Sequence, residues 1–264
     1  MKLKRISIVV LACAALSYTS CKKSSTTPTL SAQTVSTQVA LNLAQTLYGG
    51  FGAFDVTQGL NAPLTVGVSR NQIRLNMTRG RMGINTVTED PTCGLVADTT
   101  LDYTTTVDNT TASIKGNIKF TFTCTNGVAS GFNITDNLNI TESTPDLSGS
   151  YIFAENFTVQ TTQPGNDNAP ISLNGTMSLS DNLQYKTGSK ATTNESYNYT
   201  LTSIMLDPTL GDITSGTATF STKGTNSSGT WNYTGTVVFL GQHVVKITIN
   251  GEAHTINLLT GMGS

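Results

Sequence analysis

Residues 114–124, with the sequence IKGNIKFTFTC, alternate apolar and polar side chains with a period of two. Ile114, Ile118, Phe120 and Phe122 share one parity, and Lys, Asn and Thr side chains occupy the other. Successive side chains of a β-strand point to opposite faces of the sheet, so such a strand buries one face and wets the other. The stretch therefore predicts a long, half-buried antiparallel strand.

The same alternation recurs through the rest of the chain and is interrupted by clusters rich in Gly, Pro, Asn and Asp. The alternating stretches are 132–141, 151–160, 171–185, 197–206, 231–240, 243–250 and 254–260. Between the last three, Gly241-Gln242 suits a type II′ hairpin turn and Asn250-Gly251 a type I′ turn. We therefore expect a mainly β fold, in which about nine or ten long strands form an antiparallel meander, either a curved sheet or an up-and-down barrel.

One amphipathic helix is expected before the strands. Apolar side chains between residues 31 and 48 recur at the spacing of a single helical face. Ser31 is a suitable N-cap, and Gly49 with Gly50 is a suitable stop signal. We expect this helix to pack on the sheet, so that residues 31–264 form a single β-rich domain.

The N-terminus has the features of an export signal. Three basic residues precede an apolar run at residues 6–16, and small residues then lead to Cys21. Eleven apolar residues are too few to cross the roughly 30 Å of a bilayer core. The segment resembles a bacterial lipoprotein signal of the Bacteroidota type, although Tyr18 stands where Leu is usual.

The resemblance implies that residues 1–20 are removed and that Cys21 carries the lipid. Residues 22–30 would then be a flexible polar tether. The implied location is the bacterial cell envelope, on an outer-membrane leaflet facing the periplasm or the cell surface. The membrane would be a partner through this anchor. The alternative is an ordinary secretory signal that leaves Cys21 free or disulfide-bonded.

Two cysteines remain for the folded domain once Cys13 leaves with the signal and Cys21 becomes the anchor. These are Cys93 and Cys124. In an oxidising envelope compartment, a disulfide between them is the expected state. A two-cysteine metal site is the alternative, but no His lies near either residue in the sequence.

The charge pattern argues against nucleic-acid binding. Charged residues make up only 12% of the chain, and 15 basic residues face 16 acidic ones before the signal is removed. The arginines outside the signal are confined to Arg70, Arg74, Arg79 and Arg81. They could form an anion clamp, since guanidinium groups match planar acids, or they could pair with the acidic side chains of the domain.

Three strands share a motif in which an acid and an Asn interrupt the alternation. The acids are Asp136, Glu155 and Asp181, and all three have the apolar parity of their strands. A hairpin near residues 144–149 would place Asp136 opposite Glu155. Buried carboxylates need a partner. A bulge could turn each acid outward, Arg or Lys could pair with it, or the carboxylates could bind a cation such as Ca²⁺.

No catalytic or cofactor motif is present, so we expect neither an enzyme nor a cofactor. His243 and His254 are expected to be strand residues. Several aromatic side chains share the apolar parity and could line an apolar cavity or simply fill the core; they are Tyr197, Tyr199, Trp231, Tyr233 and Phe239.

The sequence thus favours a lipid-anchored binding or carrier module for an apolar or glycan ligand. One alternative is a structural or surface-interaction lipoprotein without a small-molecule ligand. A lesser one is a hydrolase that uses Asp136 and Glu155 as paired carboxylates.

Overall fold

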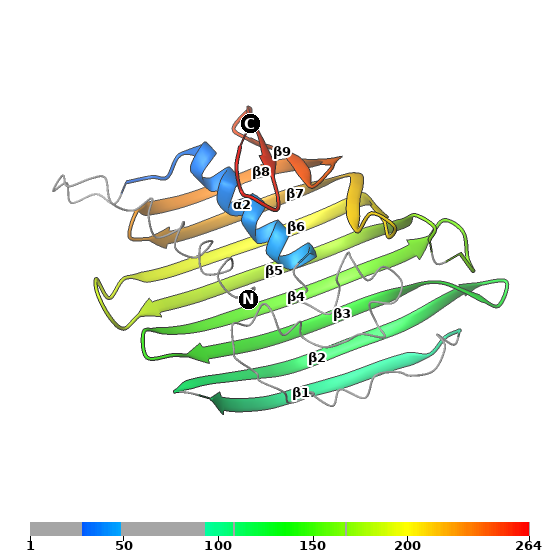
Figure 1. The fold of residues 1–264 in the computed structure, drawn as a ribbon, viewed down its shortest axis with the longest axis horizontal. Helices are drawn as coiled ribbons and strands as arrows, with labels where there is room; N and C mark the ends of the chain where they lie inside the picture. Colours follow the sequence, from blue (N-terminus) through cyan, green and yellow to red (C-terminus); the bar gives the residue numbers. More distant parts are fainter. Residues whose placement is uncertain (1–27, 49–92, 108, 167, 264) are drawn as a thin grey trace, which may run out of the picture.

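A computed structural model of the chain describes residues 28–48, 93–107, 109–166 and 168–263. The predicted signal, Cys21 and the four arginines at residues 70–81 lie outside these ranges. The described part is one antiparallel sheet with one helix (Figure 1).

The sheet has ten strands, and each pairs with the strand that follows it in the sequence (Figure 1). The first and last strands do not pair with each other, so the sheet is open. The strands are β1 (Val96–Val107), β2 (Thr110–Thr125), β3 (Val128–Ser143), β4 (Leu147–Thr161), β5 (Ile171–Tyr185), β6 (Thr192–Asp207), β7 (Asp212–Asn226), β8 (Gly229–Gly241), β9 (Val244–Ile249) and β10 (Glu252–Asn257). The predicted antiparallel meander is confirmed in its curved-sheet form.

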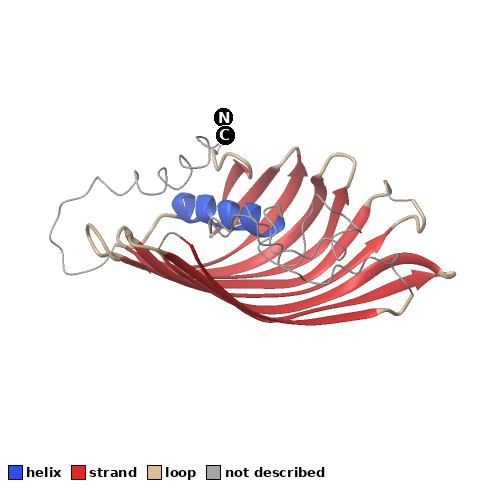
Figure 2. Ribbon diagram, turned by 60° about the horizontal axis from the view of Figure 1, so that its bottom comes forward, coloured by secondary structure: helices blue, strands red, loops and turns tan. Residues whose placement is uncertain are grey.

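Helix α2 (Ala32–Leu47) lies on the concave side of the sheet (Figure 2). Ser31 is its N-cap, and the Ser31 side chain accepts a hydrogen bond from the backbone N–H of Thr34 at 3.2 Å. The helix packs against β9 and β10. The helix predicted over residues 31–48 is therefore confirmed, together with its N-cap.

The core lies on the same concave side as α2. In the middle strands the residues of apolar parity are almost fully buried, as for Phe132, Leu138, Phe153 and Phe157. Most of their neighbours in the chain are polar and exposed, although Ile152 and Ala154 flank Phe153. The alternation in the sequence therefore sets which side chains form the core and which form the opposite, polar face.

The two short hairpin turns differ in how well the sequence predicted them. Asn250 and Gly251 both have positive φ between β9 and β10, which is the predicted type I′ turn. Between β8 and β9, however, Gln242 and His243 have positive φ (55° and 57°), so the predicted type II′ turn at Gly241-Gln242 is wrong. The turn is shifted by one residue, and in this position the His243 backbone N–H donates a hydrogen bond to the Asp212 carboxylate.

The predicted disulfide between Cys93 and Cys124 is present. It links the segment before β1 to the end of β2, where Gly94 N–H also donates to the Phe122 carbonyl. The bond therefore reinforces the attachment of the first strand to the sheet.

Replacing Cys93 and Cys124 together with Ser should lower the free energy of unfolding by about 3–4 kcal/mol, because a covalent loop across 31 residues restricts the unfolded chain. Urea denaturation of the two proteins measures the difference. Equal unfolding free energies would contradict the stabilising role.

Candidate functional site

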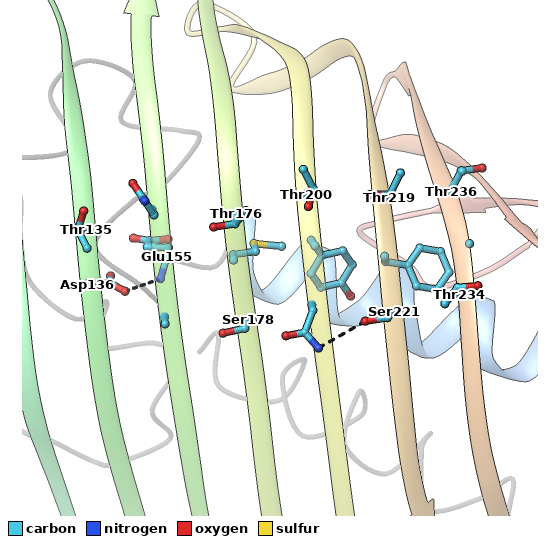
Figure 3. Close-up of a pocket in the computed structure, with 17 residues that line it drawn as sticks. Thr135, Asp136, Glu155, Thr176, Ser178, Thr200, Thr219, Ser221, Thr234 and Thr236 are labelled. Atoms are coloured by element: carbon cyan, nitrogen blue, oxygen red, sulfur yellow. Dashed lines mark hydrogen bonds between the residues drawn. The ribbon is translucent and has the colours of Figure 1, made fainter.

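A hollow of about 890 Å³ lies on the polar face of the sheet, opposite α2 (Figure 3). Six consecutive strands, β3 to β8, contribute to it. Its polar side chains come from positions that alternate with the core residues of the same strands. The hollow is therefore a feature of the sheet surface itself.

Strand register aligns the polar side chains of the hollow in two rows that cross the strands. The first row is Thr135, Asn156, Thr176, Thr200, Thr219 and Thr236, and the second is Ala154, Ser178, Asn198, Ser221 and Thr234. Figure 3 shows four threonines of the first row, Thr176, Thr200, Thr219 and Thr236, side by side on the adjacent strands β5 to β8. Strands β4 to β8 thus contribute one side chain to each row, whereas β3 contributes to the first row only.

The side chains of the two rows are electrically neutral. Asp136 and Glu155 also border the hollow, but both residues are buried and have the parity of the core. Asn198 donates a hydrogen bond to the Ser221 hydroxyl at 3.5 Å. Among the described residues, the hydroxyl of Thr200 has no hydrogen-bond partner, and the same holds for the other four threonines of the first row. As far as the described part of the chain is concerned, these hydroxyls are therefore available to a ligand.

The floor of the hollow is connected to α2 through the sheet. Tyr199, next to Thr200 in β6, is buried on the concave side, and its hydroxyl donates to the Asn42 side chain of α2 at 2.9 Å. Met177 in β5 and Phe220 in β7 lie directly opposite Tyr199 on the two neighbouring strands. A packed core therefore supports the hollow from behind.

The structure brings Asp136 and Glu155 together, as the sequence predicted, but without a bulge. The two residues are directly opposite in β3 and β4, in a register that runs unbroken along both strands. Both are buried, so the prediction that a bulge turns them outward is wrong. Because the ladder is regular, the Glu155 backbone N–H can donate to the Asp136 carboxylate at 3.0 Å. Pairing with the arginines or with a cation stays a prediction.

Asp181 lies apart from that pair and faces Glu195 instead. The register between β5 and β6 is regular at Asp181, so no bulge turns this acid outward either. The Tyr197 hydroxyl donates to Glu195 at 2.6 Å. Burial and the Glu195 charge raise the pKa of Asp181 to about 7, and burial raises the pKa of Glu195.

The sequence analysis did not single out Glu195, although its position in the strand alternation indicated burial. It shares the parity of Tyr197 and Tyr199, which are core residues. An acid on the apolar parity of β6 could have been recognised as a partner for the acids of the neighbouring strands.

A second polar cluster, also missed, joins the end of α2 to the sheet. Tyr48 donates from its hydroxyl to the buried Asp212 carboxylate at 2.8 Å, and Ile213 N–H donates to that hydroxyl at 3.1 Å. His243 Nδ1 lies 3.0 Å from Asp212 Oδ1, and the His243 ring contacts Tyr48 edge to face. His243 therefore lies in the turn directly before β9, beside the strand, and its backbone N–H is bound to Asp212.

The aromatic residues predicted as a cavity lining or as core are mostly buried on the concave side. Tyr197, Tyr199, Trp231 and Phe239 are each at most 3% exposed. Tyr233 is half-buried and donates from its hydroxyl to the Leu30 carbonyl, just before α2. They belong to the packed layer between the sheet and α2.

Comparisons with protein-family models, with curated proteins and with solved structures each gave no match. Within the described ranges, no helix has the length and apolar character needed to cross a membrane. The fold and the surface alone thus define the class, an open antiparallel meander with one concave-side helix and a neutral hollow on its polar face.

Replacing Asp181 with Asn should stabilise the protein above neutral pH. The folded-state pKa of about 7 lies above the ordinary value of 3.8, so ionisation opposes folding, and stability falls as the pH rises from about 4 to 7. The Asn variant should lose the part of this pH dependence that comes from Asp181 and gain on the order of 4 kcal/mol at pH 8. Urea denaturation from pH 4 to 8, with the exposed Asp98→Asn as control, measures both effects. An unchanged pH profile in the Asn variant would show that Asp181 does not have a raised pKa in the folded protein.

Replacing Tyr48 with Phe should destabilise the fold by about 1–2 kcal/mol, because the change removes the hydrogen bonds with Asp212 and Ile213. Tyr103→Phe, at a partly exposed site on β1, is the matched control and should have little effect. Thermal and urea unfolding compare the variants, and equal stabilities would show that the cluster does not hold the helix end.

Proposed function

We propose that the protein is a lipid-anchored protein of the bacterial cell envelope that binds a neutral glycan in the hollow on its polar face. The observation that carries this proposal is the lining of the hollow, in which six strands contribute neutral hydroxyl and amide side chains in register.

The chemistry of these side chains suits a sugar. Each hydroxyl is both a donor and an acceptor, and each Asn side chain offers both functions as well. Threonine adds a methyl group beside its hydroxyl, which resembles the mixture of hydroxyl and C–H groups around a sugar ring. The neutral rows favour an uncharged ligand, because the side chains of the rows themselves offer no ionic partner to an acid or a base.

The rigidity of the sheet supports binding as well. The threonines project from long strands whose opposite face is packed core, so little backbone ordering is needed when a ligand binds. Short side chains such as Thr and Ser also lose little conformational freedom. Many weak hydrogen bonds can then add up to a useful affinity.

The envelope location rests on the resemblance of residues 1–21 to a lipoprotein signal. The disulfide between Cys93 and Cys124 is consistent with this location, because such bonds persist in oxidising compartments. A lipid at Cys21 would keep the glycan-binding surface close to a membrane.

An apolar carrier has less support in this structure. The aromatic face that could hold such a ligand is occupied by α2, with Tyr199 bonded to Asn42 and Tyr233 to the Leu30 carbonyl. The proposal is also one of binding and not of catalysis, since the side chains of the two rows include no acid or base.

Replacing Thr176 or Thr200 with Val should weaken glycan binding about five- to tenfold per substitution, since each change removes one hydroxyl and keeps the side-chain shape. Calorimetric titration with neutral oligosaccharides, chosen by a glycan-array screen of the purified protein, measures the change. Thr104→Val is the matched control, because Thr104 is exposed on the distant strand β1.

The control should bind as tightly as the unaltered protein. Absence of binding to every neutral glycan, or equal affinities for the Thr176, Thr200 and Thr104 variants, would overturn the proposed function.

A further inference from the structure

The rows of the hollow form a long and narrow strip. Adjacent strands lie about 4.8 Å apart, so the first row, from Thr135 in β3 to Thr236 in β8, spans five intervals or roughly 24 Å. The two rows are two residues apart along each strand, which is only about 7 Å. A single sugar ring would cover a small part of this strip.

The strip also repeats the same chemistry from strand to strand. Thr176, Thr200, Thr219 and Thr236 occupy equivalent positions in four consecutive strands, β5 to β8. A surface that offers the same side chain at regular intervals matches a ligand that presents the same groups at regular intervals. The separation of the strands is close to the length of one sugar unit in an extended chain.

One end of the strip has a clear chemical boundary. Beyond Thr135, the row continues to Lys119 in β2 and then to Asp98 in β1, and both residues are exposed. At the other end, Thr236 is opposite Thr248 in β9, which continues the neutral row. The uncharged part of the row thus begins at β3 and extends across the sheet towards the C-terminal strands.

We infer that the hollow binds an unbranched, extended, neutral glycan of several sugar units, which lies across the strands along the two rows. This inference rests on the proposed function and specifies its ligand class. Each unit contacts the side chains of about one strand, and the repeated threonines allow a homopolymer to bind in several equivalent registers. Branches are disfavoured because the strip is only two side chains wide.

A chain-length series tests the inference. Calorimetric titration of the full-length protein uses neutral linear gluco-oligosaccharides of one to eight units, in both α- and β-linked forms. The affinity should rise with each added unit and level off at about five or six, and the hexasaccharide should bind at least about a hundredfold more tightly than glucose.

A bulky substitution in the middle of the strip provides the second test. Thr200→Tyr places a β-compatible side chain across the first row and leaves β7 and β8 accessible on one side and β3 to β5 on the other. The hexasaccharide affinity should fall to that of the trisaccharide, whereas the trisaccharide affinity should change less than about threefold. Thr104→Tyr on β1 is the matched control, and thermal unfolding verifies that both variants fold.

The outcomes separate the two proposals. If a mono- or disaccharide binds as tightly as the hexasaccharide, and Thr200→Tyr weakens all lengths equally, the site is a local pocket. The extended-chain inference is then overturned while the proposed function stands. If no neutral saccharide of any length binds, both proposals are overturned.

Discussion

The strand register is the constraint on which the rest of the structure depends. Side chains alternate with a period of two, so a slip of one residue would move every core side chain of a strand to the polar face. Between β3 and β4 the register runs without a shift from Gly131 to Ser143. The register shifts of the sheet lie near the ends of even-numbered strands and the starts of odd-numbered strands. In an antiparallel meander these positions are all at the same end of the sheet. Irregularity is thus confined to one end of the sheet, which leaves the middle regular enough to align side chains over six strands.

The two faces are therefore coupled through single strands. In β6, Tyr199 bonds to α2 on one face, and Thr200 points into the hollow on the other. The helix thus helps to fix the sheet behind the polar rows. The irregular end of the sheet is fixed separately, because Asp212 binds both Tyr48 from the helix and the turn at His243. Two buried polar contacts, one in the middle and one at the end, hold the helix in place.

The sequence predicted the elements better than their arrangement. Alternation within residues 114–124 and its repeats defined the strands, and helical spacing with an N-cap at Ser31 defined the helix, because both signals are local. The open edge of the sheet was not decided by these signals, since closure depends on the twist summed over all strands. The hollow was not predicted either, because it also depends on how several strands are arranged relative to one another. Each threonine was recognised as polar, but the rows exist only in the register between strands.

The acids illustrate the same limit. The hairpin at residues 144–149 correctly placed Asp136 opposite Glu155, because a short turn sets the register of its two strands. The facing of Asp181 and Glu195 was missed, since a longer connection between β5 and β6 leaves their register open from sequence alone. Of the three alternatives for these acids, the bulge is wrong; backbone N–H groups, as at Glu155, can donate to a carboxylate within a regular ladder.

The position of α2 has a consequence for how the chain folds. Each of the ten described strands pairs with the strand next to it in the sequence, so hairpins can form one after another along the chain. Among the described elements, α2 comes first in the sequence but packs against β9 and β10, which come last. The surface that α2 packs against on β9 and β10 is therefore formed only after these C-terminal strands have folded. Docking of α2 on β9 and β10 therefore brings together elements from opposite ends of the described sequence.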